Sequence, residues 1–206
     1  MIQNIVFDLG NVLLDFNPKQ FLLEKYADKI LCERLFCEVF KCPEWAMLDK
    51  GVVTQEEVVS LLSQRYPREA REIEEVFQHW TKMLKPISGT VEILPRLKEV
   101  AYNIYVLSNF HLQAFEEVYR KNAFFQYFDG IVISAQEKTS KPEEAIYRRL
   151  LLKYKLIPET SVFIDDQEEN LKAAEKLGIK TILFNHDLTN PGPDLAQRLR
   201  EYAVSI

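Results

Sequence analysis

The sequence predicts an α/β protein with a doubly wound parallel sheet and a helical domain inserted after the first strand. Short apolar segments that end in polar residues recur along the chain, as buried parallel strands do when they carry functional groups at one sheet edge. From residue 86 onward these segments alternate with helical patterns, and the stretch before them shows helical patterns alone. We therefore expect a discontinuous core, residues 1–16 and 86–206, and a helical cap domain, residues 17–85.

The first strand is the apolar segment that begins at Ile2 and ends at Phe7. Asp8 follows it directly, and Gly10 stands two residues later. An acid after a buried parallel strand lies at the carboxyl edge of the sheet, where ligands bind in such folds. Asp8 is therefore the first candidate for a catalytic residue.

The inserted segment begins at the boundary Asn17-Pro18 and contains three helical patterns. Apolar residues recur every three to four positions over 19–40 and again after Pro67. Thr54 and Glu57 have the spacing of a capping box, which opens a helix between these two patterns. The residues that this helix would bury are Val58, Leu61 and Leu62.

A helical insertion above the carboxyl edge of a sheet excludes water and contacts the leaving group of a substrate. The alternative is that it serves only in packing or dimerisation. Trp45 and Lys50 are candidates for substrate contact, and each has an ordinary alternative, core packing for Trp45 and solvation for Lys50.

The second half of the chain predicts alternating helices and strands. The expected helices cover 89–101, 111–121, 142–153, 168–177 and about 195–202, and the expected strands cover 104–108, 131–133, 161–164 and 179–184. Polar residues follow three of these strands: Ser108 and Asn109, then Lys141, then Asp165 and Asp166. Because the carboxyl ends of parallel strands share one edge, we expect these side chains to meet Asp8 there.

Composition and charge restrict the classes of partner. The 206 residues are 47% hydrophobic and 28% charged, with a net charge of −5, which gives no electrostatic footprint for nucleic acid or an anionic membrane. The apolar segment at the N-terminus is too short for a signal peptide or a membrane span. We expect a small-molecule substrate, a cytoplasmic location and a monomer or weak homodimer.

The three cysteines, Cys32, Cys37 and Cys42, form no CxxC pair, and their odd number argues against a disulfide framework. A zinc site is the less favoured alternative to packing on a helix face, because the spacing matches no common ligand motif.

The four polar strand ends, taken together, resemble the haloacid dehalogenase superfamily, most of whose members are magnesium-dependent phosphatases. The variant Asp8-Leu9-Gly10-Asn11-Val12 looks most like the branch that contains glucose-1-phosphate phosphatases. The resemblance implies a Rossmann-like core with an inserted helical cap. It also implies a phosphomonoester hydrolase that acts on a small phosphometabolite, with a sugar phosphate such as glucose 1-phosphate as the expected substrate.

The resemblance assigns a role to each residue. Asp8 would attack phosphorus and form an aspartyl-phosphate that water hydrolyses. Ser108, Asn109 and Lys141 would bind the phosphoryl oxygens. The expected ligands of Mg²⁺ are Asp8, the main-chain carbonyl near Gly10, Asp166 directly, and Asp165 directly or through the residues around the ion. Two adjacent buried acids favour a cation in their own right, since like charges raise each other's pKa.

Two further residues carry open alternatives. Asn170 lies one helical turn after Asp166 and would orient a metal-bound water or a ligand side chain, or would simply form a polar helix face. His111 could reach the site, although a histidine at the start of a helix is more often structural.

One position departs from most phosphatases of the superfamily, which carry a second acid two residues after the nucleophile. Here that position is Gly10. The nearest spare acid is Asp15, which the sequence does not identify as a replacement. The departure leaves two alternatives: a metal-independent 2-haloacid dehalogenase, and a catalytically silent binding module.

Overall fold

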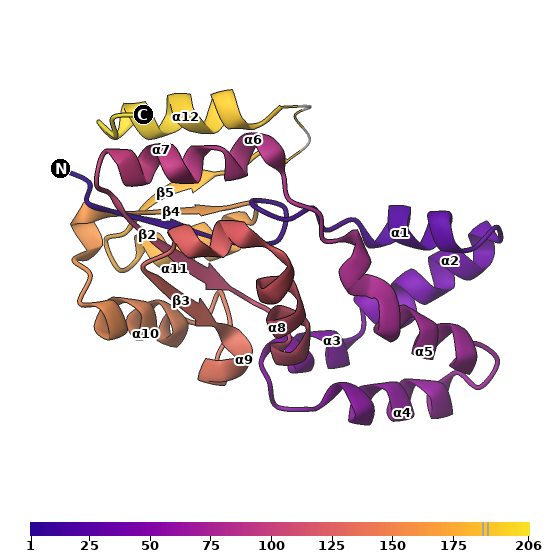
Figure 1. Cartoon of the computed structure of the whole chain (residues 1–206). Helices are drawn as coiled ribbons and strands as arrows, with labels where there is room; N and C mark the ends of the chain where they lie inside the picture. Colours follow the sequence, from indigo (N-terminus) through magenta and orange to yellow (C-terminus); the bar gives the residue numbers. More distant parts are fainter. Residues whose placement is uncertain (187, 189) are drawn as a thin grey trace.

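The computed structural model describes residues 1–186, 188 and 190–206, and it contains a parallel five-stranded sheet in the order β3-β2-β1-β4-β5 (Figure 1). The strands are β1 (Asn4–Phe7), β2 (Asn103–Ser108), β3 (Gly130–Ile133), β4 (Ser161–Asp165) and β5 (Lys180–Leu183). These are the five strands that the sequence predicts, so the α/β fold class is confirmed.

Alternating side chains of the strands pack against helices on both faces of the sheet. In β1, Ile5 and Phe7 belong to the apolar core that contains Leu94 of α7 (Ile93–Glu99) and Leu199 of α12 (Gly192–Glu201). Val6 belongs to a second core, made with α10 (Glu144–Tyr154) and α11 (Glu168–Glu175). The sheet therefore lies between α7 and α12 on one face and α10 and α11 on the other (Figure 1).

The strand order reverses at β1. From β1 the chain continues outward through β2 to β3, and it then returns to β4 on the other side of β1. In open parallel sheets such a reversal opens a crevice at the carboxyl ends of the central strands. Asp8, Ser108 and Asp165 lie at this point because they end or directly follow β1, β2 and β4.

Of the α-helices between β1 and β2, the first five lie together beside the carboxyl edge of the sheet (Figure 1). They are α1 (Pro18–Lys25), α2 (Lys29–Leu35), α3 (Pro43–Asp49), α4 (Gln55–Arg65) and α5 (Ala70–His79), with the π-helix η1 (Phe36–Phe40) and the 3-10 helix η2 (Trp80–Met83). The predicted capping box is present: the Glu57 N–H donates to Thr54 Oγ1 (3.2 Å), and the Thr54 N–H donates to Glu57 Oε2 (2.8 Å).

Several expectations need correction at the level of single elements. The pattern over 19–40 is interrupted, because Asp28 accepts the N–H groups of Ile30 and Leu31 and so begins a second helix. Leu61 is exposed, since α4 buries Val58 and Leu62 and turns Leu61 to solvent. The helix expected at residue 142 begins at Glu144.

The remaining helical elements complete the connections. They are α6 (Ser88–Val91), α8 (Leu112–Lys121), α9 (Ser134–Glu137) and the 3-10 helices η3 (Ala123–Tyr127) and η4 (Pro158–Thr160). The helix expected over 89–101 is divided between α6 and α7, and α3 and α9 were not predicted individually.

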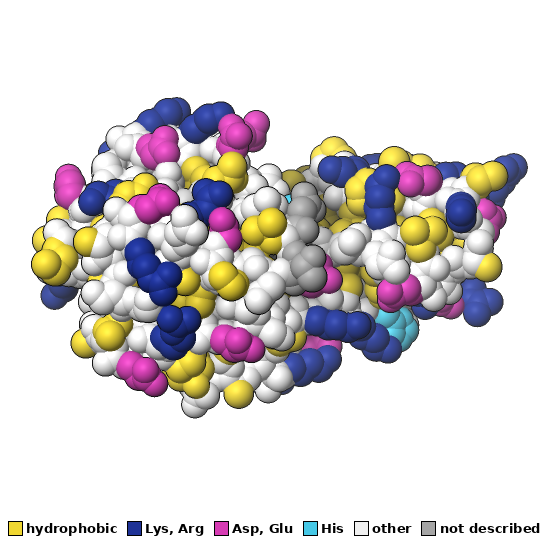
Figure 2. Space-filling model, turned by 90° about the horizontal axis from the view of Figure 1, so that it is seen from above, with side chains coloured by type: hydrophobic (Ala, Val, Ile, Leu, Met, Phe, Trp, Pro, Cys, Tyr) yellow, Lys and Arg dark blue, Asp and Glu magenta, His cyan; other side chains and the backbone are white. Residues whose placement is uncertain are grey.

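Other features of the chain agree with ordinary packing. Cys32 and Cys42 are buried and donate to main-chain carbonyls, whereas Cys37 is exposed. On the face shown in Figure 2, Lys and Arg side chains are interspersed with Asp and Glu side chains. Among the described residues, no helix has the length and apolarity needed to cross a lipid bilayer.

Candidate active site

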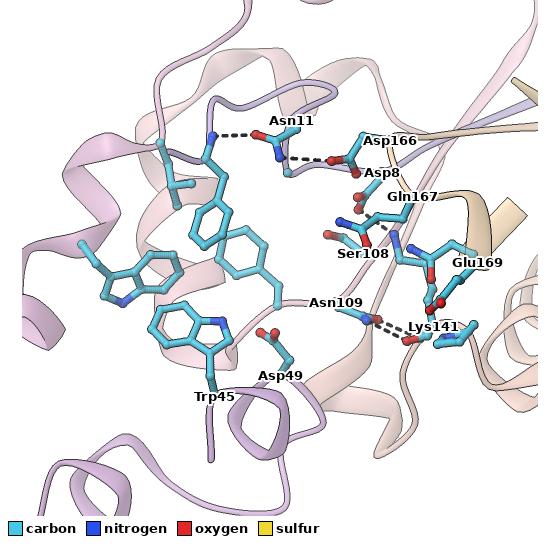
Figure 3. A pocket seen from close by; sticks show the side chains of 17 residues that line it. Asp8, Asn11, Trp45, Asp49, Ser108, Asn109, Lys141, Asp166, Gln167 and Glu169 are labelled. Atoms are coloured by element: carbon cyan, nitrogen blue, oxygen red, sulfur yellow. Dashed lines mark hydrogen bonds and ion pairs between the residues drawn. The ribbon is translucent and has the colours of Figure 1, made fainter. Parts of the chain in front are cut away.

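A cavity of about 290 Å³ lies between the carboxyl ends of the central strands and the helical insertion (Figure 3). Its floor is polar and includes Asp8, Ser108, Lys141 and Asp166. These residues come from four separate segments of the chain, which the sheet order brings together. The convergence predicted from the strand ends is therefore observed.

Lys141 lies between two carboxylates. Its Nζ is 2.8 Å from Asp8 Oδ1 and 2.7 Å from Asp165 Oδ2, and all three side chains are nearly inaccessible to solvent. Burial acts to lower the pKa of Lys141, but the charges of Asp165 and Asp8 outweigh it and raise that pKa. The ammonium group is therefore held in its charged form beside Asp8.

A third acid, Asp166, lies beside Asp8 and Asp165. Ligand atoms of Asp8, Asp165 and Asp166 lie within 4.8 Å of one another, the kind of cluster that can hold a divalent cation. Burial raises the pKa of Asp8 to about 7 even though Lys141 opposes the shift, and burial also raises the pKa of Asp166. Three carboxylates therefore face one ammonium, which leaves negative charge in the site that a cation would offset.

The two adjacent acids have different surroundings. Both oxygens of Asp165 accept from Asn170 Nδ2 (3.0 and 3.1 Å), and they also accept from Lys141 and from the N–H of Gln167. Asn170 thus orients a carboxylate of the cluster, one of the alternatives considered for it. Asp166 Oδ2 accepts from Asn11 Nδ2 (3.1 Å). Asp166 is therefore the acid better placed to offer an oxygen to a cation.

Asn11 has a role that the sequence did not reveal. Its backbone is left-handed (φ 54°), its Oδ1 accepts the N–H of Phe16, and its Nδ2 reaches Asp166. Asparagine tolerates this backbone conformation better than most residues. The only signal in the sequence was its place directly after Gly10.

The Asn109 side chain lines the cavity and also holds the backbone of Lys141, a contact that was not expected. Its Nδ2 donates to the Lys141 carbonyl (3.0 Å), and its Oδ1 accepts the Lys141 N–H (2.8 Å). Because both polar atoms of the amide bind the backbone of Lys141, Asn109 positions the lysine. Ser108 lines the cavity as expected.

The opposite wall of the cavity is apolar. It consists of Phe16, Trp45, Trp80, Leu84 and Phe110. Trp45 also packs on Phe40 and Trp80, with ring centroids 4.7 and 5.0 Å apart, so it contributes both to the core and to the wall. Lys50 lies outside the cavity lining and forms an ion pair with Glu143 (2.7 Å).

Asp49, at the end of α3, also lines the cavity, although no pattern in the sequence indicated it. His111 lies behind it, 4% exposed, with Nε2 3.2 Å from Asp49 Oδ1. The rings of Trp45 and Trp80 pack against the imidazole of His111, with ring centroids 4.5 and 5.2 Å from its own. His111 therefore contacts the wall of the site.

Asp15, the spare acid noted in the sequence, is exposed and lines other surface hollows.

Three curated relatives resemble most of this chain. It is 28% identical to drimenol cyclase of Aspergillus calidoustus over 98% of its own length, but it spans only 39% of that protein. It is 24% identical to a sesquiterpene phosphatase of Aspergillus oryzae, covering 84% of this chain and 85% of that protein. A phosphorylated carbohydrates phosphatase of Thermotoga maritima is 25% identical, with 88% and 84% covered.

Solved structures share the fold. A HAD-family enzyme of Bacteroides thetaiotaomicron superimposes with a TM-score of 0.73 at 25% identity, over 91% of this chain and 96% of that one. The same enzyme in complex with magnesium and inorganic phosphate gives a TM-score of 0.74 at 24% identity, over the same shares. The family model described as haloacid dehalogenase-like hydrolase matches residues 5–184. The chain therefore belongs to the haloacid dehalogenase-like hydrolases.

Proposed function

We propose that this protein is a magnesium-dependent phosphomonoester hydrolase with Asp8 as its nucleophile. The observation that carries the proposal is the buried group of Asp8, Lys141, Asp165 and Asp166 at the floor of a cavity. Such a group combines a nucleophile with positive charge for phosphoryl oxygens. Relatives named as phosphatases support the same reaction class.

The acidic cluster suits Mg²⁺. Magnesium prefers oxygen ligands and is commonly held by one or two carboxylates together with water and substrate phosphate. Asp8 and Asp166 would supply carboxylate oxygens, and a main-chain carbonyl at Gly10 would complete the protein's share. Asp165 is hydrogen-bonded to Lys141 and Asn170, and it would orient the groups next to the ion without binding the ion itself. The ion would supply neutralising charge where two anions must approach each other.

The chain's own residues would divide the reaction between them. A carboxylate oxygen of Asp8 attacks phosphorus, and Lys141 and Ser108 bind the phosphoryl oxygens while their charge shifts. Asn109 fixes the backbone of Lys141. Water then hydrolyses the aspartyl-phosphate and restores Asp8. Covalent catalysis suits phosphate monoesters, whose uncatalysed hydrolysis is among the slowest known.

Residues 17–85 would act as a cap domain over the core formed by residues 1–16 and 86–206. Trp45 and Trp80 of this segment line the cavity together with Asp8 of the core. The insertion would thereby exclude water and contact the leaving group.

Two substrate classes have support. A sugar phosphate, such as glucose 1-phosphate, is the class expected from the sequence, and the relative from Thermotoga maritima is named for carbohydrates. The aromatic wall formed by Phe16, Trp45, Trp80 and Phe110 favours a second class, phosphate esters of apolar alcohols. The relative named as a sesquiterpene phosphatase supports that class.

The two other interpretations of the sequence fit the site less well. A 2-haloacid dehalogenase without metal would place an anionic substrate beside three carboxylates. A silent binding module would have no need of a lysine buried between Asp8 and Asp165.

The test is release of inorganic phosphate from glucose 1-phosphate, farnesyl phosphate and 4-nitrophenyl phosphate, each with Mg²⁺ and with chelator. We expect release that requires Mg²⁺, and the preferred ester identifies the substrate class. Activity that persists in chelator would contradict the magnesium mechanism. Halide release from a 2-haloacid in place of phosphate release would favour the dehalogenase.

A further inference from the structure

Asp49 is a carboxyl group of the helical insertion that faces the reaction site. It lines the same cavity as Asp8 and Lys141, and Figure 3 shows its carboxyl directed into the cavity, across from Asp8 and Ser108. It is separate from the cluster that suits a cation, whose described members are Asp8, Asp165 and Asp166. Asp49 therefore lies on the side of the site where a leaving group would sit.

The turn that carries Asp49 is fixed to the core. The Asp49 carbonyl accepts from Ser134 Oγ, and the Gly51 carbonyl accepts from Lys138 Nζ. Gly51 also lies so close to α9 that a Cβ there would come within 2.4 Å of the Ala135 carbonyl oxygen. The carboxyl is thus held in place relative to the strands that carry Asp8 and Ser108.

The surroundings of Asp49 favour a carboxyl that keeps its proton. Burial raises the pKa of Asp49 to about 8, and the charge of Asp8 adds to the rise while Lys141 opposes it. Burial lowers the pKa of His111 to about 3, so the imidazole 3.2 Å away is neutral. Lys50, the next charged group on the turn, pairs with Glu143, which directly precedes α10.

Gly10 has no side chain that could donate a proton to the leaving group. A Cβ added at residue 10 would meet nothing within 4 Å, and the φ of Gly10 is not positive, so the backbone there does not require glycine. An alkoxide is a poor leaving group unless a positioned acid protonates it. The residue that performs this task must therefore come from elsewhere in the cavity wall.

We propose that Asp49 is the acid that protonates the leaving oxygen, in place of an acid at Gly10. This inference rests on the proposed phosphatase function. As the Asp8 oxygen bonds to phosphorus, the bond between phosphorus and the ester oxygen breaks. The Asp49 proton passes to that oxygen, which leaves as the alcohol. The Asp49 carboxylate then takes a proton from the water that attacks the aspartyl-phosphate, which restores both acids and releases phosphate.

Glu169 is the competing carboxyl. It also lines the cavity, but its side chain is exposed and belongs to the first turn of α11, on the core side. Glu169 therefore does not belong to the insertion, the side of the site where a leaving group would sit. Glu169→Gln is therefore the matched control for Asp49→Asn.

The experiment compares two esters that differ in their need for an acid. 4-Nitrophenyl phosphate has a good leaving group, whereas phenethyl phosphate has an alkoxide leaving group. The value of kcat/KM reports the steps up to departure of the alcohol, so it is measured for both esters with Mg²⁺. We expect Asp49→Asn to lower kcat/KM for phenethyl phosphate by about 10²- to 10⁴-fold, and for the nitrophenyl ester by less than about 3-fold.

The ratio of the two values within one variant does not depend on the amount of folded protein, so Asp49→Ala serves equally well if Asp49→Asn folds poorly. We also expect the alkaline limb of the phenethyl pH profile to disappear in Asp49→Asn and to persist in Glu169→Gln. Equal losses for both esters, or a selective loss in Glu169→Gln alone, would overturn the role of Asp49 and leave the phosphatase function standing. A wild-type protein that releases phosphate from neither of these esters, nor from glucose 1-phosphate or farnesyl phosphate, would overturn both.

Discussion

At the scale of single residues, the site is governed by the balance of charge around Lys141. One ammonium lies within 2.8 Å of Asp8 and 2.7 Å of Asp165, while Asp166 adds a third carboxylate to the cluster. Buried charges are costly unless they are paired. Without a cation the native protein therefore holds carboxyl groups that resist ionisation.

The excess of carboxyl groups over the single ammonium predicts how the free energy of unfolding of the metal-free protein depends on pH. The pKa of Asp8 rises from 3.8 to about 7 on folding, so the native state binds this proton more tightly than the unfolded chain does. The stabilisation is complete below pH 3.8 and is lost as pH rises through 7, and the raised pKa of Asp166 acts in the same direction. In chelator we expect the free energy of unfolding to be lower at pH 8 than at pH 5, by roughly a few kcal/mol.

Urea unfolding of the wild type and of Asp8→Asn at the two pH values checks this prediction. The amide cannot titrate, so the variant should lose part of the pH dependence. An equal dependence in both proteins would show that Asp8 does not carry the effect.

At the scale of elements, the contact between α9 and the turn after α3 sets the position of the cavity wall that carries Asp49. Gly51 has a left-handed backbone (φ 69°), and its Cα faces the backbone of Ala135. Only glycine satisfies both conditions, since another residue would be strained by its φ and would clash with a backbone that cannot move aside. The turn that carries Asp49 depends on this glycine.

We expect Gly51→Ala to lower the free energy of unfolding by about 2 kcal/mol or more, because left-handed strain alone costs about 1–2 kcal/mol. Gly10→Ala is the matched control, since a Cβ at residue 10 meets nothing within 4 Å and its φ is not positive. Urea unfolding of the two variants measures the difference. Similar losses in both would contradict the close approach of Gly51 to α9.

The elements also show what the sequence can and cannot predict. The five strands were predictable because each is a short apolar segment ending in polar residues, and the capping box at Thr54 gave the start of α4. The break between α1 and α2 was missed because the apolar spacing continues through Asp28, whose capping role depends on hydrogen bonds to the next turn. Short helices such as α3 and α9 lack enough turns to show a period.

At the scale of the whole molecule, the strand order creates the site. With β1 between β2 and β4, Asp8, Ser108 and Asp165 meet at one edge, and the sequence predicted this convergence. It could not predict the partners of each side chain. The bonds of Asn11 to Asp166 and of Asn109 to the Lys141 backbone join residues 155 and 32 positions apart. Asp49 was missed for the same reason, because its environment exists only once the insertion packs on the core.

A cation that binds across these segments should stabilise the whole chain. Mg²⁺ that binds only the folded state raises the free energy of unfolding by about 2.7 kcal/mol at a concentration 100 times its Kd. We expect Mg²⁺ to raise the thermal unfolding midpoint of the wild type, and to have little effect on Asp166→Asn. Asp15→Asn, which alters an exposed acid outside the cavity, should respond like the wild type. An undiminished response in Asp166→Asn would contradict its role as a ligand.

Detection of the phosphorylated enzyme tests the central claim, that Asp8 is the nucleophile, most directly. The protein would be mixed with 4-nitrophenyl phosphate and Mg²⁺, quenched in acid and digested, and the peptides analysed by mass spectrometry. We predict a phosphoryl group on Asp8 that is absent in chelator and in Asp8→Asn. A phosphoryl group on another residue, or phosphate release by Asp8→Asn at the wild-type rate, would contradict the account.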